Sequence, residues 1–250
     1  MKKIFFYTAL SLAIAATSAC TKVDNYAPPS CTISGSTIDE GTGQTIQTEI
    51  GGNGTRVKLL ETSYSANPVP IYFQSKQDGT FNNTKVFAAT YKVSVEGPFV
   101  PIVQTDNTGK VVADSSQTIV LQSTATLTFK VQPFLRVEWV GKPVVNGDKS
   151  VTVQVKITRG TKDPTYQLDI TNINLYVSNT QYDSQNNYDP RYSTLTSYNG
   201  SDGTALLGQT ITITTIGGAL PAQDVYLRVG ARINAGLNEY NYTTPVSVSN

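Results

Sequence analysis

The chain contains no histidine, and this absence excludes more chemistry than any other feature of its 250 residues. Catalytic arrangements that use an imidazole as general base cannot form, and neither can zinc sites with histidine ligands. A phosphate-binding loop of the G-x-x-x-x-G-K-[ST] type is also missing from the sequence. Because no catalytic signature remains, we expect a protein that is not an enzyme and needs no cofactor or metal.

Cysteine is scarce as well, with only Cys20 and Cys31 present. The N-terminal segment has two lysines followed by a short apolar run, which predicts a secretion signal over residues 1–19. The small residues that end at Cys20 resemble the lipobox of bacterial lipoproteins, which implies acylation of that cysteine. Cys31 then has no disulfide partner. The alternative is an ordinary signal peptide, which would leave Cys20 free to pair with Cys31.

Charged residues make up only 15% of the chain, and the formal net charge is +1. A nucleic-acid-binding domain would show a strongly basic patch, so no nucleic-acid partner is expected. The 18 acidic residues allow accidental carboxylate pairs of the kind that glycosidases use, but their spacing singles out none of them. Glycosidase activity is therefore the weakest interpretation.

Apolar and polar residues alternate in many short stretches separated by turn residues, and this pattern is typical of β-sandwiches. The alternating runs lie at 57–59, 71–73, 127–131, 135–139, 151–157, 173–177, 211–213, 225–233 and 246–248. No convincing helical period occurs after the signal segment. The sequence predicts an all-β fold made of two tandem antiparallel β-sandwich domains.

Pro133 lies between two well-patterned strands and is the best domain boundary. The polar, proline-containing segment 20–31 reads as a lipidated tether. The two sandwiches are then expected at 32–132 and 133–250, each with about the length that such a domain needs.

Short motifs in each half resemble known domain types. Residues 35–39 (GSTID), 42–46 (TGQTI) and 78–81 (DGTF) are similar to the opening and later strands of the carboxypeptidase-regulatory-like, transthyretin-type sandwich. This resemblance implies a packing module rather than a catalyst. Residues 224–248 resemble the last hairpin of a fibronectin-III or immunoglobulin-type sandwich.

The tether, residues 72–85 and the crossing at 133–137 together resemble one family of Bacteroidetes outer-membrane lipoproteins of unassigned biochemistry. Its members are often encoded in polysaccharide-utilisation loci beside starch-utilisation-type (Sus-like) transporters. The resemblance implies a lipid-anchored outer-membrane location, with the membrane side undetermined. It also implies a polysaccharide or oligosaccharide ligand, or a Sus-like transporter or glycan-binding lipoprotein as partner.

The best candidate surface is the polar stretch 181–200, which contains four tyrosines. Tyrosine offers a broad amphipathic surface with little side-chain entropy to lose, as in antibody loops rich in Tyr, Ser and Asn. Sugar rings present an apolar C–H face and a polar rim, which such a surface fits. The predicted ligand-binding residues are Tyr182, Tyr188, Asp189, Arg191, Tyr192 and Tyr198.

Other interpretations of this stretch stay open. The rings could cover an edge strand, or they could pack against the first domain or a partner protein. Asp183, Asn186, Asn187 and Asp189 could ligate calcium, although a hydrated loop is favoured. Elsewhere, Trp139 is expected to point into the core, and the glycine-rich segment 51–54 is expected to be a hairpin loop.

The sequence therefore predicts a non-catalytic outer-membrane lipoprotein that binds glycan or supports a glycan-uptake system. The alternative is a structural or assembly module that binds protein partners of an outer-membrane complex.

Overall fold

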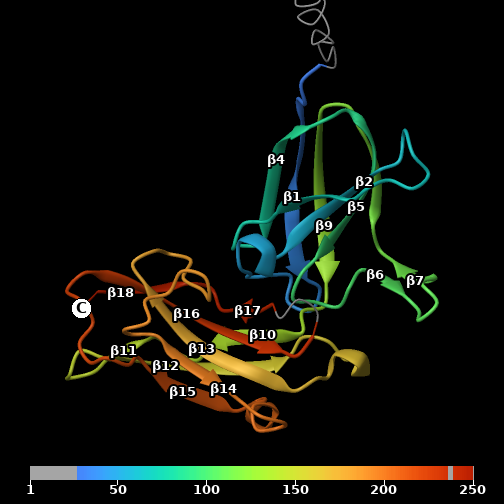
Figure 1. Ribbon diagram of the computed structural model, residues 1–250. Helices are drawn as coiled ribbons and strands as arrows, with labels where there is room; N and C mark the ends of the chain where they lie inside the picture. Colours follow the sequence, from blue (N-terminus) through green and yellow to red (C-terminus); the bar gives the residue numbers. More distant parts are fainter. Residues whose placement is uncertain (1–26, 236–238, 250) are drawn as a thin grey trace, which may run out of the picture.

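The computed structural model describes residues 27–235 and 239–249, so the predicted signal segment and Cys20 lie outside the described residues. The chain forms two β domains, and the long axis of the second lies across the lower end of the first (Figure 1). No helix in the part that the structure describes is long and apolar enough to span a membrane.

The N-terminal domain contains two sheets that pack face to face. One sheet has the order β4-β1-β9 and the other β3-β2-β5-β8, while β6 and β7 form a separate hairpin. Its strands are β1 (Cys31–Asp39), β2 (Arg56–Glu61), β3 (Ile71–Gln74), β4 (Thr80–Val86), β5 (Ala89–Glu96), β6 (Val103–Thr105), β7 (Val111–Asp114), β8 (Gln117–Leu121) and β9 (Thr124–Val131). Ile33, Val57 and Val93 are fully buried between the two sheets, as alternating strands that face one core require.

Strands β1 and β9 run parallel, which departs from the otherwise antiparallel pairing of the described strands. Gly35 allows their close approach. A Cβ atom at this position would collide with the carbonyl oxygen of Leu127 and with the ring of Phe81. Cys31, at the start of β1, is buried and unbridged.

The C-terminal domain also has two sheets around its own core. One has the order β10-β12-β11 with β15 added to β12, and the other β14-β13-β16-β17 with β18 added to β16. Its strands are β10 (Leu135–Trp139), β11 (Val144–Val145), β12 (Val151–Arg159), β13 (Ile170–Ser178), β14 (Thr194–Ser197), β15 (Thr210–Thr214), β16 (Asp224–Ile233), β17 (Asn241–Tyr242) and β18 (Val246–Ser249). In β12, Val151, Val153, Val155 and Ile157 face the core and the residues between them do not.

The all-β class with two sandwich-type domains is as the sequence predicts, and each alternating run coincides with a strand. One local prediction was wrong. The glycine-rich segment does not form a plain hairpin loop, because Gly51–Asn53 winds into one turn of 3-10 helix. Gly51 has a φ of 83°, and a side chain on Gly54 would collide with the carbonyl of Glu49. Glycines therefore permit a tight turn that any other residue would strain.

The two domains meet through polar contacts. At the end of β1, Asp39 accepts a hydrogen bond from Arg136 of β10, with 2.7 Å between Nη2 and Oδ1. Asn241 of β17 donates to the carbonyl oxygen of Pro98 at 3.0 Å. Burial acts to raise the pKa of Asp39, but its bonds to Arg136 and the Gly41 amide outweigh this effect and hold the pKa below its usual range. These contacts fix how the domains sit against each other.

Candidate functional site

The tyrosine segment forms a loop that folds back onto the end of β13. The Asp189 amide donates to the carbonyl oxygen of Val177 at 2.7 Å, and the amide of Val177 donates to Ser193 Oγ at 2.9 Å. After Ser193 the chain enters β14, which lies at the edge of its sheet. One of the alternatives left open by the sequence, an edge strand within this segment, is therefore present as β14 (Thr194–Ser197).

A cavity of about 530 Å³ lies between this loop and the segment that leads into β16. This volume is within the range of small-molecule sites, about 300–1,000 Å³. We call it the tyrosine cavity. It is lined by Val177, Ser178, Asn179, Asn187, Tyr188, Asp189, Pro190, Arg191, Tyr192, Pro221, Gln223 and Val225. Four of the six residues expected at a ligand site, Tyr188, Asp189, Arg191 and Tyr192, thus line one cavity.

The charged pair of the tyrosine cavity is fixed and partly open to solvent. Arg191 Nη2 lies 2.7 Å from Asp189 Oδ2, and Arg191 Nε lies 3.0 Å from Oδ1, so the pair is bidentate. The hydrogen bond from Arg191 holds the pKa of Asp189 below its usual range. The guanidinium of Arg191 also lies over the ring of Tyr192, 5.3 Å from the ring centroid. The Arg191 side chain is 74% exposed. The remaining N–H groups of Arg191 are available to a ligand.

Tyr182 and Tyr198 lie elsewhere, so the four tyrosines do not form one surface. Tyr198 packs against the core of the C-terminal domain. The ring of Tyr182 lies 5.6 Å from the guanidinium carbon of Arg228, at the junction of the domains. Tyr188 also packs against the buried ring of Tyr176, at 5.5 Å between centroids.

The oxygen-rich residues considered for calcium are likewise separated. Asp183 is fully buried, whereas Asp189 pairs with Arg191 at the surface. The amide of Asn187 donates to Thr180 Oγ1 and to the carbonyl oxygen of Tyr182. Across the described ranges, no group of three or more acidic or cysteine side chains is placed to hold a metal ion.

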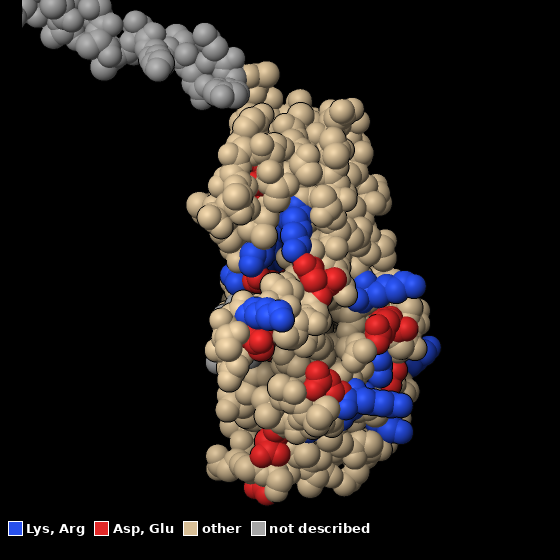
Figure 2. All heavy atoms as spheres, turned by 90° about the vertical axis from the view of Figure 1, so that its right-hand side faces the viewer, with Lys and Arg blue, Asp and Glu red and all other residues tan. Residues whose placement is uncertain are grey.

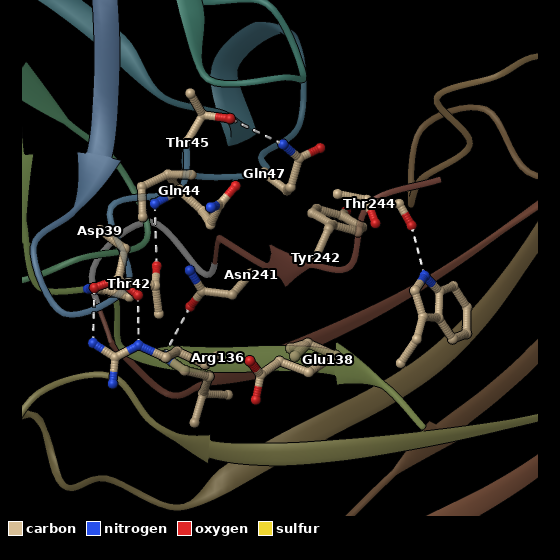
Figure 3. A pocket seen from close by; sticks show the side chains of 15 residues that line it. Asp39, Thr42, Gln44, Thr45, Gln47, Arg136, Glu138, Asn241, Tyr242 and Thr244 are labelled. Carbon is tan, nitrogen blue, oxygen red and sulfur yellow. Dashed lines mark hydrogen bonds and ion pairs between the residues drawn. The ribbon is translucent and has the colours of Figure 1, made fainter. Parts of the chain in front are cut away.

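A second cavity, of about 320 Å³, lies between the domains (Figure 3). We call it the interdomain cleft. Its upper wall comes from the N-terminal domain, and its lower wall comes from β10 and β17. It is lined by Asp39, Thr42, Gln44, Thr45, Ile46, Gln47, Pro133, Leu135, Arg136, Val137, Glu138, Trp139, Asn241, Tyr242 and Thr244.

Trp139 contributes to this cleft although the sequence predicts it in the core. One part of its indole packs against the C-terminal core, and the residue also lines the interdomain cleft. Its Nε1–H donates to the carbonyl oxygen of Thr244 at 2.8 Å. The alternation of β10 identified the correct side of the strand. It could not show that the strand end projects beyond the core to the domain junction.

Behind the cleft lies a buried polar cluster that the sequence analysis missed. Arg228 of β16 is fully buried and donates to the carbonyl oxygens of Thr48 at 3.1 Å and Thr243 at 2.9 Å. Its guanidinium lies 4.3 Å from the centroid of the Tyr242 ring. Glu49 accepts hydrogen bonds from Ser184 Oγ at 2.7 Å and from the Tyr242 hydroxyl at 3.0 Å.

Two carboxyl groups near this junction are buried. Burial raises the pKa of Asp183 to about 8; Arg228 opposes the shift, and Glu49 adds to it. Both carboxyl oxygens of Asp183 lack a hydrogen-bond partner among the described residues. Burial also raises the pKa of Glu239 to about 8. Both groups are therefore largely protonated at neutral pH, because an unpaired buried charge is costly.

The signal for this cluster was present in β16. The period-two alternation puts Val225, Leu227 and Val229 in the core, so Arg228 must lie on the opposite face. That face would be solvent-exposed in an isolated domain. Only knowledge of the domain junction shows that it is covered.

The face of the molecule drawn in Figure 2 shows no large field of one sign. On this face, basic and acidic side chains are interspersed, and they gather toward the domain junction and the second domain rather than the far end of the first. This distribution gives no footprint for a polyanion.

Comparisons with known proteins agree with this architecture. Residues 31–132 match the family model "Protein of unknown function (DUF3823) N-terminal domain", and residues 141–247 match "Domain of unknown function (DUF3823_C)". No curated protein matches the chain.

Solved structures of several bacterial proteins are similar to the chain. A DUF3823 family protein from Bacteroides uniformis is 34% identical with a TM-score of 0.80, covering 88% of this chain and 99% of its own. A second protein from Bacteroides uniformis, named "putative carbohydrate binding protein", is 23% identical with a TM-score of 0.65, covering 89% of this chain and 100% of its own. A DUF3823 family protein from Parabacteroides merdae is 21% identical with a TM-score of 0.66, covering 89% and 100%.

Proposed function

The chain belongs to the DUF3823 family, and from the geometry of its surface we propose that it is a non-catalytic carbohydrate-binding protein. The observation that carries the proposal is the tyrosine cavity. It combines two aromatic rings with a fixed carboxylate–guanidinium pair and several amides around about 530 Å³.

The chemistry of the cavity suits a sugar. The rings of Tyr188 and Tyr192 provide apolar surfaces for the C–H face of a pyranose, and their hydroxyls can donate or accept. Arg191 and Asp189 are already oriented by their mutual bonds, so little side-chain entropy would be lost when hydroxyl groups bind to them. Asn179 and Gln223 also line the cavity and add amide donors and acceptors.

The name given to the Bacteroides uniformis relative with the same fold is consistent with this proposal. The location is part of the proposal too. Acylation of Cys20 would anchor the chain to the outer membrane, with segment 20–31 as the tether. A Sus-like polysaccharide-uptake system would then be the setting in which the captured glycan is used.

A binding experiment tests the proposal. The chain from residue 21 to residue 250 is titrated calorimetrically with a panel of neutral and acidic polysaccharides. We expect binding to at least one of them, weakened by Tyr188→Ala, by Tyr192→Ala and by Arg191→Ala. Arg191 is mostly exposed, so its loss should leave the fold intact. Tyr64→Ala is the matched control, because this exposed tyrosine lies in the N-terminal domain.

No binding to any glycan in the panel, together with co-purification of an outer-membrane transporter, would replace this proposal with the assembly role. Release of reducing sugar from any substrate would contradict the non-catalytic assignment.

A further inference from the structure

We propose that the interdomain cleft is a second carbohydrate site, independent of the tyrosine cavity, and that it takes a neutral sugar ring. The site would be built jointly by both domains. It goes beyond the proposed function because it would make the protein bivalent toward glycan.

One wall of the interdomain cleft carries a side-chain oxygen that accepts no hydrogen bond from the described residues. Gln47 lines the cleft, and its Nε2 donates to Thr45 Oγ1 at 3.4 Å. Its Oε1 is buried and has no hydrogen-bond partner within the described part of the chain. A buried acceptor left unsatisfied is costly, and the single hydrogen bond of this amide is long. A small rotation of the Gln47 side chain that brings Oε1 to a ligand hydroxyl in the cleft is therefore favoured.

Strand β10 lies at the edge of its sheet and lines the interdomain cleft. The carbonyl oxygen of Phe134 accepts from Gly160, and the amide of Val140 donates to Gln154, so these groups face β12. Backbone groups alternate sides in an antiparallel strand, and Leu135 accordingly points its amide away from β12, to Asn241 Oδ1 at 3.1 Å. By the same alternation, the backbone groups of Val137 and Trp139 face the cleft side, where hydroxyl groups can reach them.

Trp139 gives the interdomain cleft an aromatic wall. The hydrogen bond to Thr244 holds the indole of Trp139 in place, so stacking on it would cost little further ordering. A half-buried aromatic side chain beside polar groups suits the amphipathic faces of a sugar ring.

The charged side chains of the cleft determine which class of sugar it favours. Arg136 is committed to Asp39 and to the carbonyl oxygens of Arg159 and Gly160. Glu138 is exposed and lines the same cleft, as its position in Figure 3 shows. With its cation neutralised and an open carboxylate on its wall, the cleft disfavours uronic acids and favours neutral rings.

Trp139 is the single tryptophan of the chain, so tryptophan fluorescence reports on this cleft alone. The chain from residue 21 to residue 250 is titrated with neutral gluco-, manno-, xylo- and galacto-oligosaccharides and with oligogalacturonate. We expect at least one neutral oligosaccharide to shift the emission and to protect Trp139 from acrylamide, and oligogalacturonate to do neither.

Two variants identify the site. Gln47→Leu removes the orphan acceptor at little cost to folding, and it should weaken the fluorescence-detected affinity about three- to tenfold. Gln122→Leu is the matched control; this exposed glutamine lies in the first domain at the turn between β8 and β9 and does not line the cleft. Tyr188→Ala should leave the fluorescence titration unchanged, which separates this site from the tyrosine cavity.

The proposal is overturned if no neutral oligosaccharide changes the signal of Trp139, or if Gln47→Leu binds as the wild type does. A calorimetric stoichiometry that falls from two sites to one in Tyr188→Ala, with an intact fluorescence response, would support both sites. A stoichiometry of one in both wild type and Tyr188→Ala, with a fluorescence response that Gln47→Leu abolishes, would support the interdomain cleft and remove the tyrosine cavity.

Discussion

Arg228 in β16 donates from Nη1 to the carbonyl oxygen of Thr48 across the domain junction, over 3.1 Å and with no exposure to solvent. A guanidinium buried in this way is tolerated only because carbonyl oxygens and an aromatic face replace its water. The contact therefore joins two domains whose hydrophobic cores are separate.

Replacing this arginine should destabilise the whole protein. Arg228→Met keeps much of the side-chain volume but leaves the carbonyl oxygens of Thr48 and Thr243 without their donor. We expect the free energy of unfolding to fall by roughly 3 kcal/mol. Urea denaturation measures the change, with Arg191→Ala as a surface control that should shift it by less than about 0.5 kcal/mol. A midpoint unchanged by Arg228→Met would show that the buried contact does not hold the domains together.

Asp183 should make stability depend on pH. Its pKa is raised to about 8 in the folded chain, above the unfolded value near 4, so the folded state binds the extra proton. The stabilisation is complete below the unfolded pKa and is lost as pH rises through the folded pKa. We expect Asp183→Asn to flatten the decline in stability between pH 5 and pH 9 by roughly 4 kcal/mol.

Thermal unfolding of wild type and variant across that pH range tests this expectation. Some slope should remain in Asp183→Asn because Glu239 has a similarly raised pKa. Asp106→Asn is a suitable control, since the pKa of that exposed carboxyl is lowered by its hydrogen bonds to Thr108 and Lys110 and does not titrate in this window. Parallel curves for Asp183→Asn and wild type would contradict a protonated Asp183.

Gly35 should tolerate no side chain. A methyl group there would meet the Leu127 carbonyl and the Phe81 ring, so Gly35→Ala must separate β1 from β9 or displace buried atoms. We expect a loss of about 1–3 kcal/mol, as for other overpacked cores. Chemical denaturation detects it, and Gly147→Ala at the β11–β12 turn, where a Cβ meets nothing nearby and φ is not positive, should cost less. Equal losses for the two variants would refute the close approach.

Tyr198 should behave differently from Tyr188. Its ring packs against the core of the C-terminal domain and does not line the tyrosine cavity. Tyr198→Ala is therefore expected to lower stability by about 1–3 kcal/mol, as a large-to-small change at a partly buried site, while leaving glycan affinity unchanged. A loss of glycan affinity in Tyr198→Ala with unaltered stability would contradict this expectation and would indicate that glycan binds at β14.

The strands were predictable because the signals that specify them are local. In β12 and β16 the alternation of β-branched and polar residues determines both the strand and its buried face. The parallel β1–β9 pair was not predictable, because parallel neighbours are brought together by the fold and not by a turn.

The candidate site was predictable only in part, for the same reason. The composition of residues 181–200 pointed to Tyr188, Asp189, Arg191 and Tyr192, which line one cavity. Tyr182 lies beside Arg228, and Asp183 is buried next to Ser184. Arg228 and Ser184 bond to Thr48 and Glu49 of the first domain, more than a hundred residues away in the chain. No local sequence pattern predicts the interdomain cleft, because its residues come from β10, β17 and the loop after β1, which are far apart in the chain.

The most direct test of the central claim is calorimetric titration of wild type and Arg191→Ala with the best glycan of the panel. We expect measurable binding by the wild type and a dissociation constant about three- to tenfold higher for Arg191→Ala, with unchanged thermal stability. Equal affinity of the two proteins for every glycan, or no binding by either, would contradict carbohydrate recognition at the tyrosine cavity.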